Sequence, residues 1–204
     1  MTQIRIARAS DAGDILAIYA PYILHTSITF ETEVPDPASF AARITSYLQS
    51  WPWLVAESGG RIMGYAYASR YRERSGYQWS VECSVYIHDE FLRRGLAGKL
   101  YQALFSLLQQ QGYRNVYAVI NLPNDRSVSF HEACGFRWFA NYEQVGYKLG
   151  QWKTVGWWRL ILNEFGPDPA PPLPFRVLDI RQVEAVLDQF PEGKAKGDSH
   201  PDTR

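Results

Sequence analysis

The residues best suited to chemistry form a glycine-containing segment in the middle of the chain. Residues 91–98 read FLRRGLAG and stand between a predicted strand and a long amphipathic segment of helical spacing. Small residues let the backbone approach a ligand, and a helix start leaves about four amide N–H groups unpaired at the positive end of the helix dipole. These features predict a binding site for a diphosphate group. The spacing of the glycines fits neither GxGxxG nor the Walker pattern, which argues against a dinucleotide or ATP as the ligand. The alternative is a plain helix start, with glycine for packing and arginine for solubility.

Two single ionisable residues stand in settings that are unusual for their type. Glu82 lies mid-strand between Val81 and Cys83, where strand propensity disfavours a carboxylate. Partial burial would raise its pKa and suit it to general base work, whereas the plainer interpretation is a solvent-facing glutamate. His131 lies on a short predicted helix, four residues before Gly135. A lone histidine in such a place is more often structural than functional.

A polar loop ahead of the strand that carries the glutamate holds two arginines. Arg72 and Arg74 flank Glu73. A guanidinium binds a carboxylate through paired, planar hydrogen bonds, so the loop is a candidate anion site as well as a solvated charged turn. The candidate walls of the substrate cleft are Tyr77, Phe30 and Ser27.

The elements that must position these residues alternate along the chain in the order β-α-α-β-β-β-α-β-α-β-β. A helix begins after the cap residue Asp36, and Gly112 ends the long helix that follows the glycine segment. The predicted strands span residues 4–8, 53–58, 62–71, 79–87, 115–120, 136–145 and 154–162, and a loop that begins at Gly146 joins the last two.

This order predicts a mixed α/β sheet with flanking helices. The strands on either side of the long helix are expected to be parallel and joined by a right-handed crossover, and the other strands antiparallel. The site is expected where the chain leaves the strand that ends at Ile87.

Composition narrows the classes of function. The 21 basic and 21 acidic residues give a net charge of zero, so we expect no nucleic-acid partner and no basic membrane face. The two cysteines, Cys83 and Cys134, sit in apolar stretches and indicate buried thiols in a reducing compartment. No apolar run approaches the roughly 20 residues of a membrane span, and the N-terminus does not have the pattern of a signal peptide. We therefore expect a cytoplasmic protein.

Taken together, the segments resemble the GNAT acetyltransferases and, within them, the phosphinothricin acetyltransferases. The run RRGLAG at residues 93–98 is similar to the GNAT pyrophosphate loop, although Leu92 stands where Gln or Arg is usual. Similarity to the phosphinothricin branch rests on WPWLVAE at 51–57, VECSVYI at 81–87, NLPNDRS at 121–127, HEACGF at 131–136 and VGYKLGQWK at 145–153. The resemblance covers about residues 3–180.

The resemblance implies a GNAT-like, mostly antiparallel sheet that is splayed between its two parallel central strands. It implies acetyl-CoA as the cosubstrate and no metal. The backbone of the glycine segment would hold the diphosphate, and the strand before it would pair with the pantetheine arm. The cofactor-binding residues on this basis are Val85, Tyr86, Ile87, Arg93, Arg94, Gly95, Leu96, Ala97, Gly98, Asn124 and Ser127.

The resemblance also implies that a substrate amine attacks the thioester directly, with Glu82 as the general base, acting directly or through water. His131 replaces a tyrosine of most GNAT enzymes, and would protonate the departing thiolate or hydrogen-bond the substrate. The implied substrate is a small amino acid analogue such as phosphinothricin, methionine sulfone or methionine sulfoximine. The family is commonly homodimeric, so we expect a homodimer.

The expected division is an acetyltransferase domain at residues 1–165, a proline-rich C-terminal arm at 166–180, and a short helix with a disordered tail at 181–204. Two other functions stay open. One is acetylation of a different amine, such as a polyamine or a peptide N-terminus, and the other is a non-catalytic acyl-CoA-binding module.

Overall fold

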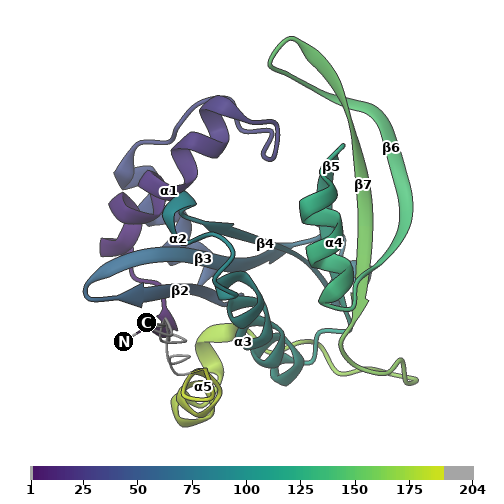
Figure 1. The fold of residues 1–204 in the computed structure, drawn as a ribbon. Coiled ribbons are helices and arrows are strands. Elements are labelled where there is room, and N and C mark those ends of the chain that lie inside the picture. The colour runs from purple at the N-terminus through teal and green to yellow at the C-terminus, as the bar shows by residue number, and fades with distance from the viewer. Residues whose placement is uncertain (1, 191–204) are drawn as a thin grey trace, which may run out of the picture.

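The computed structural model describes residues 2–190, and the tail predicted after residue 190 lies outside them. The strands are β1 (Thr2–Ile6), β2 (Trp53–Ser58), β3 (Arg61–Arg70), β4 (Ser80–Ile87), β5 (Asn115–Leu122), β6 (Arg137–Lys148) and β7 (Gln151–Ile161). The helices are α1 (Ala12–His25), α2 (Pro37–Tyr47), α3 (Leu96–Gln111), α4 (Asp125–Ala133) and α5 (Ile180–Leu187) (Figure 1). The predicted order of strands and helices is confirmed.

The strands form one sheet in the order β1-β2-β3-β4-β5-β7-β6, in which only β4 and β5 run parallel. That pair is short, because only Ser80 to Glu82 of β4 pair with Asn115 to Tyr117 of β5. Beyond Glu82 the two strands separate, and β6 and β7 extend away from the body of the molecule (Figure 1). The predicted mixed, mostly antiparallel sheet splayed between two parallel central strands is confirmed.

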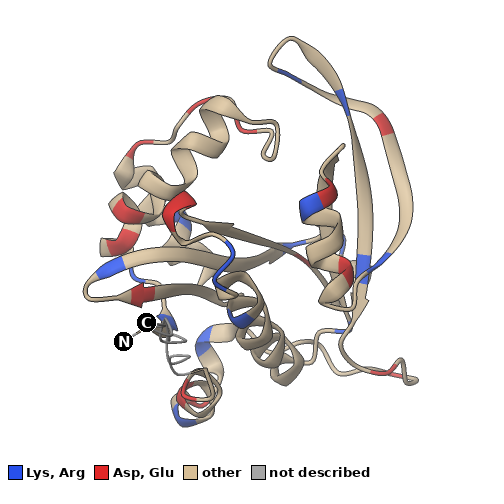
Figure 2. Ribbon diagram, in the orientation of Figure 1, with Lys and Arg blue, Asp and Glu red and all other residues tan. Residues whose placement is uncertain are grey.

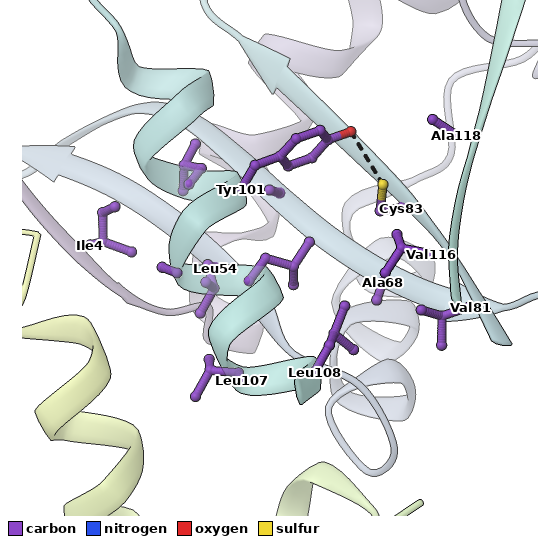
Figure 3. Packing of buried hydrophobic residues seen from close by; sticks show 14 of the residues in the cluster. Ile4, Leu54, Ala68, Val81, Cys83, Tyr101, Leu107, Leu108, Val116 and Ala118 are labelled. Carbon is purple, nitrogen blue, oxygen red and sulfur yellow. Dashed lines mark hydrogen bonds between the residues drawn. The ribbon is translucent and has the colours of Figure 1, made fainter. Parts of the chain in front are cut away.

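Helices cover both faces of the sheet and bury two apolar clusters. On one face α3 contributes the fully buried Leu100, Leu104, Leu107 and Leu108, which share a cluster with Leu54 and Val116 of the strands. Figure 3 shows Leu107 and Leu108 of α3 beside the sheet. On the other face α1 and α2 bury a second cluster, which includes Ile15, Phe40 and Ile44. Each such side chain contributes about 1.5–3 kcal/mol on burial, so the sheet is fixed from both sides.

The ends of the helices follow local sequence signals. The Asp36 carboxylate accepts hydrogen bonds from the backbone N–H groups of Ala38 and Ser39 and so caps α2. Gly112 adopts a left-handed conformation, with φ of +91°, directly after α3. Both predicted helix boundaries are confirmed.

The hairpin of β6 and β7 differs from the prediction. The loop expected to begin at Gly146 is instead strand, since β6 continues to Lys148 and only Leu149 and Gly150 form the turn, both with positive φ. Gly146 is needed for a long-range contact, because a Cβ there would lie 2.4 Å from the ring of Phe30. The glycine therefore makes room for the α1–α2 loop and does not end the strand.

The C-terminal segment is tied to the domain. The Gln111 amide donates to the backbone oxygens of Ser50 and Leu173, at 2.8 and 2.7 Å. Phe175, directly after the proline-rich run, is 7% exposed and belongs to the core cluster of α3. Next in the chain, α5 buries Val183 and Val186 in the same cluster.

Charged residues are spread over the ribbon and do not gather on one element (Figure 2). Among residues 2–190, none of the helices is long and apolar enough to cross a membrane.

Candidate active site

A cavity of about 400 Å³ lies between the end of β4, the start of α3, and α4. All the cofactor-binding residues predicted from the sequence line it, from Val85 to Ile87, from Arg93 to Gly98, and at Asn124 and Ser127, and so does His131. The other lining residues, which the sequence analysis did not select, are Tyr22, Ile28, Phe91, Leu92, Arg126 and Phe130.

The loop before α3 has a backbone shaped to hold an anion. Gly95 adopts φ of +75° at the helix start, and Arg93 adopts φ of +63°, which is uncommon for a side chain other than glycine. Left-handed residues that alternate with ordinary ones turn successive N–H groups toward one point, and the unpaired amides of the α3 start add to it. Figure 2 shows this basic segment directly before α3. The guanidinium of Arg94 lies over the ring of Phe91, with its Cζ atom 5.1 Å from the ring centroid.

The edge of β4 that faces β5 is open beyond Glu82. From Cys83 to Ile87 the strand pairs only with β3, so its other edge can bond an extended ligand. The Tyr22 hydroxyl donates to the carbonyl of Ile87 at 2.7 Å and ties α1 to the end of this edge. An open edge that leads into an amide cradle suits a long ligand with a diphosphate at one end.

Glu82 stands at the point where β4 and β5 separate. Its side chain is 31% exposed, and burial raises the pKa of its carboxyl to about 6, although Arg72 opposes the rise. The Arg72 guanidinium lies over the rings of Tyr71 and Trp157, at 4.7 and 5.4 Å from their centroids. A carboxyl with this pKa can accept a proton near neutral pH.

Aromatic side chains that the sequence analysis did not select surround this carboxylate. Tyr117 is opposite Glu82 in the parallel register and stacks on Tyr71 with a centroid distance of 4.4 Å, and Trp157 lies edge-on to Tyr71. These residues come from β5, the segment after β3, and β7. Only the pairing register brings them together, so no local signal identifies them.

The residues predicted to bind substrate fall into two groups. Arg72, Arg74 and Tyr77 line a second cavity of about 270 Å³ at the start of β4, together with Trp51 and Tyr113. Phe30 and Ser27 instead lie in the α1–α2 loop, which α1 and the sheet hold in place. The structure therefore does not bring all five residues to one wall.

The α1–α2 loop is fixed by the strands across the splayed region. The Asn121 side chain donates to the carbonyl of Ser27, and the buried Lys148 ammonium donates to the carbonyl of Thr29 at 2.7 Å. Phe30 packs against Gly146 in the same region. The loop therefore spans from α1 to the β6–β7 hairpin.

His131 is 7% exposed, and both nitrogens of its ring have partners. Nδ1 lies 2.7 Å from the carbonyl oxygen of Ser127, and Nε2 lies 3.1 Å from the hydroxyl of Tyr101. Burial lowers the pKa of His131, although the bond to Ser127 opposes this.

Cys83 is also buried, which raises the pKa of its thiol to about 12. Within the described part of the chain, no group of three His, Cys, Asp or Glu residues could hold a metal ion.

A splayed sheet with an amide cradle at the end of its open strand defines an acyltransferase of the GNAT class, and the comparisons agree with this. Residues 4–157 match the family of acetyltransferase (GNAT) domains. The chain belongs to this family and is an acyltransferase.

Similar proteins share most of their length with this chain. A phosphinothricin N-acetyltransferase from Streptomyces viridochromogenes is 38% identical over 85% of this chain and 93% of its own. An L-methionine sulfoximine/L-methionine sulfone acetyltransferase from Salmonella typhimurium is 33% identical over 79% and 95%. The crystal structure of a phosphinothricin acetyltransferase from Sinorhizobium meliloti in complex with AcCoA is 28% identical, with a TM-score of 0.78 over 86% and 98%. The resemblance stated from the motifs is confirmed.

Proposed function

We propose that this chain transfers the acetyl group of acetyl-CoA to the amino group of a small amino acid analogue of the phosphinothricin, methionine sulfone or methionine sulfoximine type. The observation that carries the proposal is the position of Glu82. Its carboxyl, with a pKa of about 6, lies where the open edge of β4 begins, so a base and a site for an extended cofactor adjoin each other.

The lining of the 400 Å³ cavity fits acetyl-CoA. Amides at Arg93, Gly95 and the first turn of α3 would hold its diphosphate, and the edge from Val85 to Ile87 would pair with its pantetheine arm. Gly95 leaves open space where a side chain would stand. When bound, acetyl-CoA supplies an acetyl group activated as a thioester.

Glu82 would remove the proton from the substrate ammonium, directly or through one water, and so produce the free amine that attacks. Ionised Glu82 can take this proton at neutral pH, because its pKa of about 6 leaves most of it deprotonated. Cys83 is unsuited to form an acyl-enzyme, since burial raises its thiol pKa to about 12 and thiolate is the nucleophilic form. The properties of Glu82 and Cys83 therefore support direct transfer of the acetyl group from the thioester to the amine, without an acyl-enzyme.

The substrate's acidic groups would meet guanidinium groups. Arg72 lies beside Glu82, and Arg74 and Tyr77 line the adjoining 270 Å³ cavity. A guanidinium binds a carboxylate or phosphinate in a planar, paired geometry. Phe30 and Ser27 would close the cleft from the side of the α1–α2 loop.

The decisive experiment is a thiol-release assay with acetyl-CoA and a panel of amines. We expect turnover with phosphinothricin, methionine sulfone and methionine sulfoximine, and none with spermidine or an N-terminal peptide. Turnover of spermidine alone would replace the proposal with a polyamine acetyltransferase. Acetyl-CoA binding by calorimetry with no turnover of any amine would make the chain a non-catalytic binding module.

We further propose that the protein is a cytoplasmic homodimer that works without a metal, with residues 1–165 as the catalytic domain and the following arm and helix as its support. Large aromatic side chains on the β6–β7 hairpin are exposed, among them Trp138, Tyr147 and Trp152, at 54%, 58% and 64%. Such a surface suits an apolar interface between two copies. Light scattering of the full chain should give twice the 23.4 kDa mass, and a monomeric mass would reject the dimer.

A further inference from the structure

One carbonyl group decides where the protons of the buried histidine lie. The backbone oxygen of Ser127 is 2.7 Å from Nδ1 of His131, one helical turn away on α4. A carbonyl oxygen can only accept a hydrogen bond, so Nδ1 must carry the hydrogen. Because burial lowers the pKa of His131, the ring is neutral and Nε2 keeps a free lone pair.

The position of the hydrogen on Nδ1 of His131 determines where the hydrogens of the Tyr101 hydroxyl and the Cys83 thiol point. Tyr101 has its hydroxyl oxygen 3.1 Å from Nε2 of His131, and a nitrogen without a hydrogen can only accept, so the phenol donates to it. The Tyr101 oxygen in turn accepts the S–H of Cys83 at 3.4 Å. Figure 3 shows this phenol reaching from α3 toward Cys83 on β4. A hydrogen-bond chain therefore runs from β4 through α3 to α4.

The hydrogen-bond chain continues from His131 to Ser127, which lines the cofactor cavity. The Ser127 hydroxyl lies 3.3 Å from Nδ1 of His131, so the N–H is shared between the carbonyl and hydroxyl oxygens of Ser127. An oxygen that accepts this bond has its own hydrogen free to donate elsewhere. Ser127 lines the cavity, whereas Tyr101 is 1% exposed and does not.

We propose that Tyr101 is a positioning residue for this site: its hydroxyl donates to Nε2 and holds the orientation of the His131 ring, whose Nδ1–H tautomer the Ser127 carbonyl fixes. The ring held in this way keeps its N–H on the Ser127 hydroxyl oxygen and leaves that hydroxyl as a hydrogen-bond donor to the bound cofactor. The acceptor on the ligand is a carbonyl oxygen or a sulfur, and its identity as part of acetyl-CoA rests on the proposed function. Tyr101 itself touches no ligand.

A hydrogen-bond chain with the reverse direction is excluded on chemical grounds. If Tyr101 donated to Cys83, then Nε2 of His131 would have to carry a hydrogen as well as Nδ1. The ring would then be a buried imidazolium, and the described residues provide it with no carboxylate partner. Cys83 offers no compensating anion, because burial raises its pKa to about 12.

The test that does not depend on turnover is a nitrogen-15 NMR spectrum of protein labelled at its four histidines, with His131→Asn used to assign the signal. We expect the neutral tautomer with the hydrogen on Nδ1 in the wild type. Tyr101→Phe should keep the hydrogen on Nδ1 but move the Nε2 signal toward that of a nitrogen with no hydrogen bond, because its donor is lost. Tyr65→Phe, which removes another buried hydroxyl from the opposite cluster, should move neither signal. A hydrogen on Nε2 in the wild type would overturn the proposal, whatever the enzyme acetylates.

The kinetic test uses methionine sulfone as the probe amine. Tyr101→Phe should lower kcat by about 10-fold, the scale of one lost hydrogen bond, and change the KM for acetyl-CoA by less than about threefold. Ser127→Ala should lower kcat similarly, and the double variant should lose no more than the worse single variant. If the double variant instead lost kcat by the product of the two single losses, Tyr101 would act independently of Ser127, which would overturn the proposal. Absence of wild-type turnover would instead reject the proposed function and leave the tautomer result intact.

Discussion

The Arg72 guanidinium lies 3.9 Å from the Glu82 carboxylate, close enough to attract it yet too far for a hydrogen bond. Stacking on Tyr71 and Trp157 holds the arginine at this distance. Burial and the guanidinium thus act on the Glu82 pKa in opposite directions, and burial prevails, with a pKa of about 6. The carboxylate remains a usable base because it is not fully neutralised by its neighbour.

Replacing Arg72 should therefore change the pH dependence of the reaction. In Arg72→Gln the attraction that favours the ionised carboxylate is lost, so the pKa of Glu82 should rise further above its ordinary value. The base is active when deprotonated, so the acidic limb of the kcat/KM profile should move to higher pH. Arg74→Gln should leave that limb in place, since Arg74 does not contribute to the Glu82 pKa. An unmoved limb in Arg72→Gln would show that another group titrates there.

Removing the base itself should separate chemistry from binding. Glu82→Gln keeps the shape of the side chain but cannot take a proton, so kcat should fall by about 10²-fold or more. The affinity for acetyl-CoA, measured by calorimetry, should barely change, because the cofactor cavity does not include Glu82. Full activity of Glu82→Gln from pH 5 to 9 would assign the proton transfer to a different residue.

The cofactor loop should depend on one backbone conformation. Gly95 has φ of +75° and open space around its missing Cβ, so Gly95→Ala meets no clash but pays about 1–2 kcal/mol for the left-handed conformation. We expect a lower melting temperature and at least tenfold weaker acetyl-CoA binding, as the amide cradle distorts. Gly13→Ala, in α1 with equal space and no positive φ, is the matched control and should not reduce either quantity.

Local spacing was sufficient to predict the order of elements, and the resemblance to GNAT enzymes supplied cofactor-binding residues that line the cavity. The cradle consists of consecutive residues at one strand–helix junction, so the sequence places Arg93 to Gly98 together before any tertiary contact is known. Glu82 could be singled out because a carboxylate is unusual in a strand.

Long-range contacts account for what the sequence analysis missed. Gly146 was interpreted as a loop residue, and only its contact with Phe30 explains a glycine inside β6. Tyr117 meets Glu82 through the register of two parallel strands, and Tyr101 meets His131 across two helices. Neither relationship leaves a periodic pattern in the chain, so neither could be derived from spacing.

The stability of the N-terminal strand should depend on the partly buried ion pair of Arg5 and Asp11. Arg5 donates two hydrogen bonds to Asp11, at 2.7 and 2.9 Å, and the backbone N–H of Arg8 donates a third at 2.7 Å. Burial opposes ionisation of Asp11, but these bonds together outweigh it and hold its pKa below the ordinary value. A depressed carboxyl pKa contributes stability above the unfolded-state pKa of about 3.9, and this stability is lost as pH falls through the folded-state pKa.

Asp11→Asn should therefore lower the free energy of unfolding by about 2 kcal/mol at pH 7, because it leaves the Arg5 guanidinium with weaker partners. The difference from wild type should shrink below about pH 4, where unfolded wild type also binds the proton. Urea unfolding at several pH values measures both quantities. Asp36→Asn is the control, since asparagine caps a helix as well as aspartate does and α2 keeps its cap. A pH-independent difference for Asp11→Asn would show that packing, and not the charge of Asp11, stabilises this corner of the fold.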